Sequence, residues 1–148
     1  MNPDKLPPLT EFRHSVPLQI RFNDIDILGD LNNTVYFSFF DTGKAYFFES
    51  IRKGKIDWKK VDSVIANIDC AYVAPIFFGE KIEVRSRCSG VSDRSFRVQQ
   101  VIVETETGQL KAAAETVMVS FDPATQKSKE LPAHWREALE ESMAVKDA

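Results

Sequence analysis

The sequence predicts an α+β fold in which one antiparallel sheet of five strands wraps around one long central helix. Three observations lead to this prediction: an aromatic segment with helical periodicity at residues 34–52, strand-like alternation before and after it, and short connections between the later strands. Short connections favour antiparallel neighbours. A helix that is apolar on nearly every side needs cover on nearly every side, and a curved sheet provides it.

The central helix is predicted first because its pattern is the clearest. Seven of the sixteen aromatic residues of the chain lie between Tyr36 and Phe48. Apolar or small residues recur at the three- and four-residue spacing of one helix face: Tyr36, Phe40, Gly43, Phe47 and Ile51. Val35, Phe39 and Tyr46 widen this face, whereas Phe37 and Phe48 lie away from it. Asn32 or Asn33 is expected to cap the first turn, and Gly54 is expected to end the last one.

Five segments alternate like strands and are bounded by turn residues. They are residues 14–22, 63–73, 81–90, 94–105 and 110–121. In the first segment, one face is expected to carry Val16, Leu18, Ile20 and Phe22. In the second, the corresponding set is Val64, Ala66, Ile68, Cys70 and Tyr72. Residues 131–143 are expected to form a short C-terminal helix.

Composition favours one domain over residues 1–148, with 1–12 as an extended arm and 143–148 as a frayed tail. The net charge of −3 gives no general attraction to nucleic acid, and no apolar run is long enough for a membrane span. Cys70 and Cys88 lie in strand-like segments, which favours reduced, buried thiols and a cytoplasmic protein. A single sheet leaves its far face and its edges incompletely covered, so we expect a homodimer or homotetramer.

The acidic loop before the helix carries the most informative motif. Asp24 and Asp26 are followed by Gly29, the pair Asn32–Asn33 and Tyr36, with Asp41 and Lys44 on the helix. This order resembles the opening signature of hotdog-fold acyl-CoA thioesterases of the 4-hydroxybenzoyl-CoA thioesterase family, which includes the Tol–Pal-associated acyl-CoA thioesterases. A second match lies in residues 71–84, at Tyr72, Pro75, Gly79, Glu80 and Val84. Together with the strand order, the resemblance covers residues 16–121.

The resemblance implies a hotdog fold, hydrolysis of an acyl-CoA thioester and a role for each matched residue. Asp26 takes the position of the catalytic carboxylate, either as a nucleophile or as a general base. Gly29 lets the backbone pass close to the substrate, and Tyr36 lines the acyl pocket. The backbone N–H near Asn33 polarises the thioester oxygen, a role that the positive end of a helix suits. No separate cofactor is implied, because coenzyme A is part of the substrate.

The chain departs from the family pattern at one position. The family often has histidine after the glycine, where this chain has Asp30. We expect Asp30 to be one of the substrate-binding residues. The two histidines, His14 and His134, lie outside the motif, which argues against a hotdog dehydratase. Three aspartates in the loop also raise the question of a metal, but their spacing matches no Ca²⁺ loop, so none is predicted.

The sequence fits either of two acyl carriers, coenzyme A or acyl carrier protein, and either a catalytic or a non-catalytic role. Arg94 and Ser95 sit at a turn where the family places part of its coenzyme A contacts, and arginine suits phosphate oxygens. Acyl carrier protein is the second carrier, since a lysine cluster follows the helix: Lys53, Lys55, Lys59 and Lys60. The Asp30 departure keeps open a non-catalytic module that binds acyl-CoA or only dimerises.

Overall fold

The computed structural model describes residues 1–54 and 62–144. The central helix is α1 (Val35–Arg52), and the C-terminal helix is α2 (Ala133–Ala144). The strands are β1 (His14–Leu18), β2 (Ser63–Tyr72), β3 (Ile82–Val91), β4 (Ser95–Glu104), β5 (Leu110–Asp122) and β6 (Lys127–Ser128). Three short 3-10 turns lie before α1, at Pro3–Lys5, Leu9–Glu11 and Phe22–Asp24.

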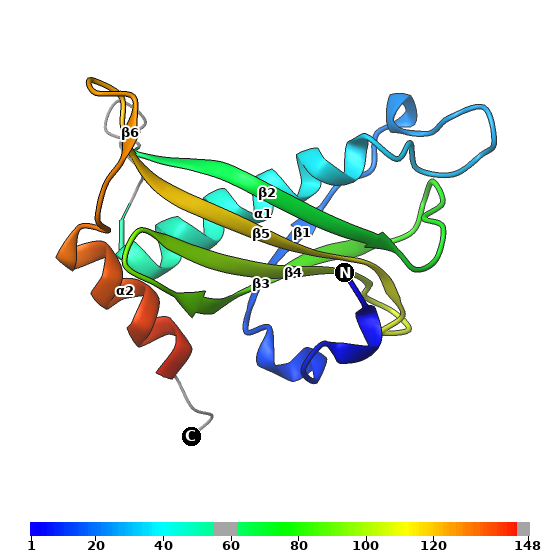
Figure 1. Ribbon diagram of the computed structural model, residues 1–148. Helices are drawn as coiled ribbons and strands as arrows, with labels where there is room; N and C mark the ends of the chain where they lie inside the picture. Colours follow the sequence, from blue (N-terminus) through cyan, green and yellow to red (C-terminus); the bar gives the residue numbers. More distant parts are fainter. Residues whose placement is uncertain (55–61, 145–148) are drawn as a thin grey trace.

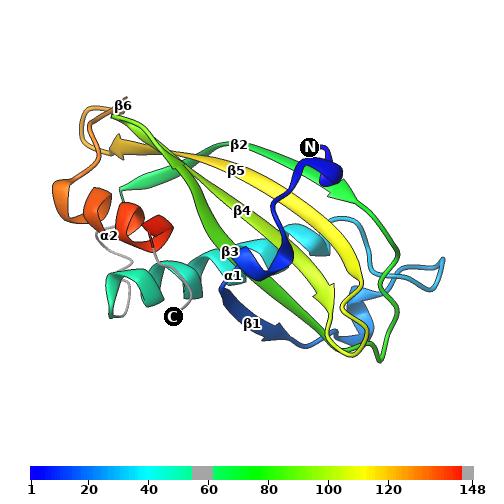
Figure 2. The same cartoon turned by 90° about the horizontal axis from the view of Figure 1, so that it is seen from below.

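The strands form one antiparallel sheet in the order β1-β3-β4-β5-β2, with β6 added beside β5. The sheet curls along α1, and α2 closes one end of it (Figures 1 and 2). This is the hotdog arrangement, so the predicted fold class is confirmed. The prediction lacked only β6, which is two residues long and therefore too short to show a pattern in the sequence.

The faces of β2 differ from the prediction because a bulge interrupts this strand between Ile65 and Asn67. Ile68 and Cys70 pack against the core that α1 shares with the sheet, as predicted. On the other side of the bulge, however, Ile65 pairs with Met118, a residue of the core, and Val64 pairs with Val119. A bulge places two residues opposite one and reverses the alternation. Val64 therefore faces away from the side predicted for it.

Helix α1 buries one broad face rather than its whole circumference. The buried residues are Tyr36, Phe39, Phe40, Gly43, Lys44 and Phe47. Tyr46 is 53% exposed, so the prediction that it widens the buried face is wrong. Phe48, predicted to lie away from that face, packs edge-on against Phe96 and Trp135, because α2 covers this side of α1.

Both ends of α1 differ in detail from the predicted caps. The N-cap residue is Thr34, and the Asn32 side chain acts just before the helix by accepting a hydrogen bond from the Thr34 N–H at 3.0 Å. At the other end Lys53, not Gly54, takes the left-handed conformation, with φ 57°. Its N–H bonds to the Glu49 and Ser50 carbonyls and so ends the helix.

Helix α1 lies close to the sheet at Gly43, with no room there for a side chain. A methyl group at this position would lie 2.6 Å from Val84 Cγ1 and 2.9 Å from Gln100 Nε2. Gln100 is fully buried and donates hydrogen bonds to the Phe40 carbonyl at 2.9 Å and to Ser86 Oγ at 3.0 Å. Gly43 on the helix and the hydrogen bonds of Gln100 from the sheet therefore fix how closely α1 packs against the sheet.

The first dozen residues are not the extended arm that was predicted. Two of the 3-10 turns fold them against the face of the sheet opposite α1 (Figure 2). Phe12 is buried there beside Val101, Val103 and Ala113. Apolar residues at the start of the chain can cover apolar strand positions, which offsets the entropy of ordering them. Part of the predicted tail is also ordered, since α2 reaches Ala144; residues 145–148 lie outside the described residues.

Both cysteines are free thiols: Cys88 is buried, and Cys70 is half-buried. Burial raises the pKa of each thiol, which suits a packing role. Within the described residues, no helix is long and apolar enough to cross a membrane.

Candidate active site

The loop between β1 and α1 is anchored by Asp24. Its carboxylate is 1% exposed and accepts hydrogen bonds from the Arg21 N–H at 2.8 Å and from Arg21 Nη2 at 2.9 Å. These hydrogen bonds hold the pKa of Asp24 below its usual range, against the effect of burial. The Asp24 carbonyl accepts from the Asn32 N–H at 2.9 Å, which closes the loop. Asp24 therefore has a structural role in the loop. Phe22, predicted to share the strand face of Ile20, lies in a 3-10 turn and is exposed.

Asp26 begins a tight turn that its own side chain stabilises. Its Oδ1 accepts from the Leu28 N–H at 2.8 Å, and its carbonyl accepts from the Gly29 N–H at 3.0 Å. Gly29 has φ 89°, a conformation that glycine adopts without strain. The Asp26 N–H then bonds to the Asp30 carbonyl at 2.9 Å. Among the described residues, Asp26 Oδ2 has no hydrogen-bond partner, so one carboxylate oxygen remains available for chemistry.

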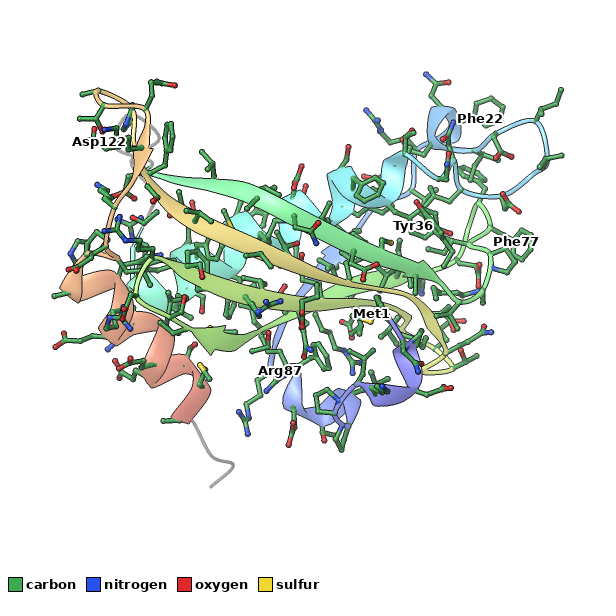
Figure 3. The ribbon with its side chains drawn as sticks, in the orientation of Figure 1. Met1, Phe22, Tyr36, Phe77, Arg87 and Asp122 are labelled. Atoms are coloured by element: carbon green, nitrogen blue, oxygen red, sulfur yellow. The ribbon has the colours of Figure 1, made fainter. Side chains whose placement is uncertain are left out.

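Asp26, Asp30, Asn33 and Tyr36 line one open cleft of about 350 Å³. The opposite wall is residues 72–75, at the end of β2 and in the turn that follows. This turn is held in place on both sides. Leu31 donates its N–H to the Ile76 carbonyl at 2.8 Å, and the buried Lys111 ammonium bonds to the Pro75 carbonyl at 2.8 Å. Figure 3 shows Tyr36, Phe22 and Phe77 gathered at this end of the molecule.

The start of α1 supplies the donors of the cleft. In the described part of the chain, the Asn33 N–H has no hydrogen-bond acceptor, while the Asn33 carbonyl accepts from the Tyr72 hydroxyl at 3.0 Å. Tyr72 therefore holds the peptide at the helix start. A free amide at the positive end of a helix is suited to stabilise a developing oxyanion.

Tyr36 forms the apolar floor of the cleft. It is buried and meets Tyr72 edge to face, with the ring centroids 4.8 Å apart. Burial, with the nearby Asp30 carboxylate adding to it, raises the pKa of the Tyr36 phenol to about 12. The phenol therefore stays neutral through the physiological range and offers an uncharged surface to an acyl group.

The structure does not bring Arg94 and Ser95 to this cleft. Arg94 Nη1 donates to the Ser128 carbonyl at 2.9 Å, and Ser95 Oγ lies 2.6 Å from Ser92 Oγ. Ser95 pairs with Val119, near the start of β2, whereas Tyr72 is at the end of that strand. A strand rises about 3.3 Å per residue, so roughly 30 Å separates the two ends of β2. Within one chain, both residues have local structural contacts far from Asp26.

The β2 wall of the cleft was not among the site residues predicted from the sequence. Tyr72 was predicted as a strand residue and, with Pro75, as a match to the family's strand–turn–strand segment, and Val73 and Ala74 carry no chemical signal. The strand-to-helix contact of Tyr72 with Asn33 spans 39 positions in the chain, so no local pattern predicts it. Neither histidine lines the cleft. Within residues 1–54 and 62–144, no group of three or more His, Cys, Asp or Glu side chains is arranged to hold a metal ion.

Comparison with known families identifies the chain. The model of the thioesterase-like superfamily matches residues 20–139. The chain belongs to this superfamily. Its structural neighbours share the hotdog fold, so the chain is a hotdog domain of the thioesterase-like superfamily.

One protein is similar to the chain in sequence, a second is similar in sequence and fold, and a third is similar in fold alone. A chloroplastic acyl-acyl carrier protein thioesterase of Arabidopsis thaliana is 30% identical over 86 residues, which are 57% of this chain and 45% of that protein. The chain therefore spans less than half the length of that relative. A thioesterase from Thermus thermophilus, solved with coenzyme A and Zn, is 26% identical with a TM-score of 0.78, covering 89% of this chain and 95% of that one. A Staphylococcus aureus protein solved with CoA has a TM-score of 0.81 at 12% identity, covering 91% and 86% of the two chains.

Proposed function

We propose that this thioesterase hydrolyses an acyl-CoA thioester to a free acid and coenzyme A, with Asp26 as the catalytic carboxylate. The observation that carries the proposal is the cleft itself, where a free Asp26 oxygen and the unbonded Asn33 amide line the same space. The Thermus thermophilus and Staphylococcus aureus structures, both solved with coenzyme A, support this choice of carrier.

The reaction needs a base or a nucleophile on one side of the thioester carbonyl and a donor on its oxygen. As a general base, Asp26 takes a proton from water, the resulting hydroxide attacks the carbonyl carbon, and the oxyanion accepts from the Asn33 N–H. The tetrahedral intermediate then collapses, the C–S bond breaks, and the proton passes to the departing sulfur. As a nucleophile, Asp26 attacks the carbonyl carbon, and the C–S bond breaks to release the coenzyme A thiolate, which takes a proton from water. Water then hydrolyses the acyl anhydride to the free acid and the Asp26 carboxylate. Asp30 lines the cleft beside Asp26, whereas Gly29 does not line it and contributes by closing the turn that begins at Asp26.

A thiol-release assay on a panel of acyl-CoAs tests the role of Asp26. We expect Asp26→Asn and Asp26→Ala to lose about 10²–10⁴-fold in kcat, the usual contribution of general acid–base catalysis. Asp93→Asn, a change of the same kind at an exposed aspartate in the turn before β4, is the matched control. Equal turnover by the wild type and both Asp26 variants would remove Asp26 from the mechanism.

The two roles of Asp26 differ in one observable product. An acid-quenched single turnover, examined by intact mass, retains an acyl adduct on the chain if Asp26 is the nucleophile and leaves the mass unchanged if it is a general base. Turnover of no thioester by a folded wild type, with coenzyme A still bound in calorimetry, would instead favour a non-catalytic acyl-CoA-binding module.

Acyl carrier protein is the alternative carrier. The name of the Arabidopsis relative favours it, and Lys53 after α1 is exposed, as a contact for an acidic partner requires. Lys55, Lys59 and Lys60 lie outside the described residues. The specificity ratio, kcat/KM for one acyl group on the two carriers, decides between them.

We further propose a homodimer or homotetramer that forms along β2. This strand is a free edge of the sheet and leaves Val64, Ile65 and Tyr72 exposed. Unpaired strand edges invite another chain, and exposed apolar side chains favour burial. Light scattering after gel filtration measures the state, and a stable monomer at micromolar concentration would contradict this proposal. A cytoplasmic location remains part of the proposal, in agreement with the two free thiols.

A further inference from the structure

Residues 1–12 cross the outer face of the sheet, the face opposite α1, on their way to β1 (Figure 2). At the start of this segment, the Met1 nitrogen lies 2.5 Å from Asp69 Oδ2 on β2. At its end, Phe12 is 3% exposed and leads into β1 at the opposite edge of the sheet. The segment, here called the strap, therefore runs across the back of the sheet from one edge strand to the other.

The strap covers an apolar patch on two neighbouring strands. The members of this outer patch lie on β4 and β5 and are fully buried against Phe12: Val101, Val103 and Ala113. Alternate residues of a strand share a face, and Ile102, between the two valines, belongs to the core beneath α1. The outer patch therefore points away from α1, and only the strap separates it from solvent.

Side chains, rather than strand pairing, hold the strap in place. In the part of the chain that the structure describes, no backbone hydrogen bond joins the strap to the sheet. The strap instead bonds its own peptide groups in the turns Pro3–Lys5 and Leu9–Glu11, and its three prolines have no N–H to give to a strand. The Arg87 guanidinium lies over the Phe12 ring, 5.8 Å from its centroid. A segment attached in this way can leave the sheet without breaking any strand pair.

We propose that the strap is an intramolecular cap, and that its displacement lets the outer patches of two copies of this chain pack face to face. Two sheets stack in this way when each presents an apolar face, and a two-fold axis through the patch sets the same residues against each other. Arg85 and Glu83 pair in register with Val101 and Val103 and form an ion pair with each other at 2.7 Å. The border of the patch therefore carries no net charge that would keep a second copy away.

This role of the strap goes beyond the proposed assembly along β2, which uses an edge of the sheet and leaves its outer face untouched. With the strap in place, the outer face is closed to a second copy. The role is also independent of the one proposed for Asp26, because its test measures mass and not turnover.

Phe12→Asp tests the strap, because a carboxylate does not stay buried among apolar side chains. We expect light scattering after gel filtration to show a species of twice the wild-type mass, whose share rises with protein concentration. Trypsin cleavage after Lys5 should be about 10-fold faster or more, since cleavage follows local opening. Thr10→Asp is the matched control, because Thr10 is exposed in the same turn, and it should keep the wild-type mass and cleavage rate.

A second change separates specific pairing from general aggregation. In Phe12→Asp combined with Val103→Lys, the released patches of two copies repel each other, and we expect the wild-type mass to return. If Phe12→Asp does not fold in thermal melting, Leu9→Asp replaces it, since Leu9 packs at the edge of the same cluster.

Four results would overturn the proposal. The first is a cleavage rate after Lys5 that does not change, and the second is a released strap with the wild-type mass. The third is open-ended aggregation without a species of twice the mass. The fourth is a doubled mass that persists when Val103→Lys is added.

Discussion

Replacing Gly43 with alanine tests how the helix sits in the sheet. On an exposed helix this change stabilises by about 1 kcal/mol, because alanine is the better helix former. Here the new methyl would lie 2.6 Å and 2.9 Å from the two Val84 methyls and 2.9 Å from Gln100 Nε2. These distances are well inside van der Waals contact, so α1 or the sheet must shift.

The magnitude follows from two costs and one opposing gain. Overpacking a core costs about 1–3 kcal/mol, and displacing Gln100 from the Phe40 carbonyl leaves buried polar groups that cost about 1–3 kcal/mol more. After subtracting the helix-propensity gain of about 1 kcal/mol, we expect Gly43→Ala to destabilise by about 3 kcal/mol, which for a chain of this size lowers Tm by roughly 6–12 °C.

Urea unfolding followed by circular dichroism measures the change, and Gly54→Ala is the control because nothing lies within 4 Å of a methyl group there. A double-mutant cycle with Val84→Ala isolates the contact. Removing the Val84 methyls makes room, so we expect a favourable coupling of about 1 kcal/mol between the two changes. A Gly43→Ala variant as stable as the wild type, or a coupling near zero, would refute the reasoning.

Three further predictions concern the loop and the cleft. Arg21 lowers the pKa of Asp24 in the folded protein. The charged Asp24 therefore stabilises the fold fully above its unfolded-state pKa of about 3.9. This stabilisation is lost as the pH falls through the lower pKa that Asp24 has in the folded state. Acid unfolding of Asp24→Asn should therefore show a smaller loss of stability below pH ~4 than the wild type shows. The pKa of Tyr36 is about 12, so its phenol does not ionise below pH ~10. The pH–rate profiles of the wild type and Tyr36→Phe should therefore have the same alkaline side up to pH ~10. A fall in rate over this range in the wild type alone would contradict the assignment of Tyr36 as a neutral wall of the cleft. Tyr72→Phe removes the hydrogen bond to the Asn33 carbonyl. We expect kcat to fall about 2–10-fold, the effect of one neutral hydrogen bond, and KM to change little. An unchanged kcat would show that this hydrogen bond does not position the Asn33 amide.

The sequence was informative where the site is local. Asp26, Asp30, Asn33 and Tyr36 lie within eleven consecutive positions, so one loop and one helix turn bring them to the same cleft. The strand pattern also located the five long strands along the chain, since each alternating segment could be identified by itself.

The position of residues far from the loop in sequence was harder to predict, although the strand order along the chain was enough to place Arg94 away from the cleft. Chain reversals alternate between the two ends of a sheet. Because β2 ends at the cleft with Tyr72, β3 starts there and β4 starts at the far end, which carries Arg94 and Ser95 away. Tyr46 and Phe48 were misplaced for a different reason: a segment that is aromatic on every side does not reveal which side another helix will cover.

The bulge in β2 limits how another strand can add to the free edge. It divides the edge into two segments of opposite alternation, and only the part from Asn67 to Tyr72 presents one unbroken repeat that leads to the cleft. In such a repeat, sliding a partner strand by a single position turns each of its side chains to the wrong face. The extra residue at the bulge therefore restricts the registers in which another strand can pair with β2, although it forms no part of the cleft.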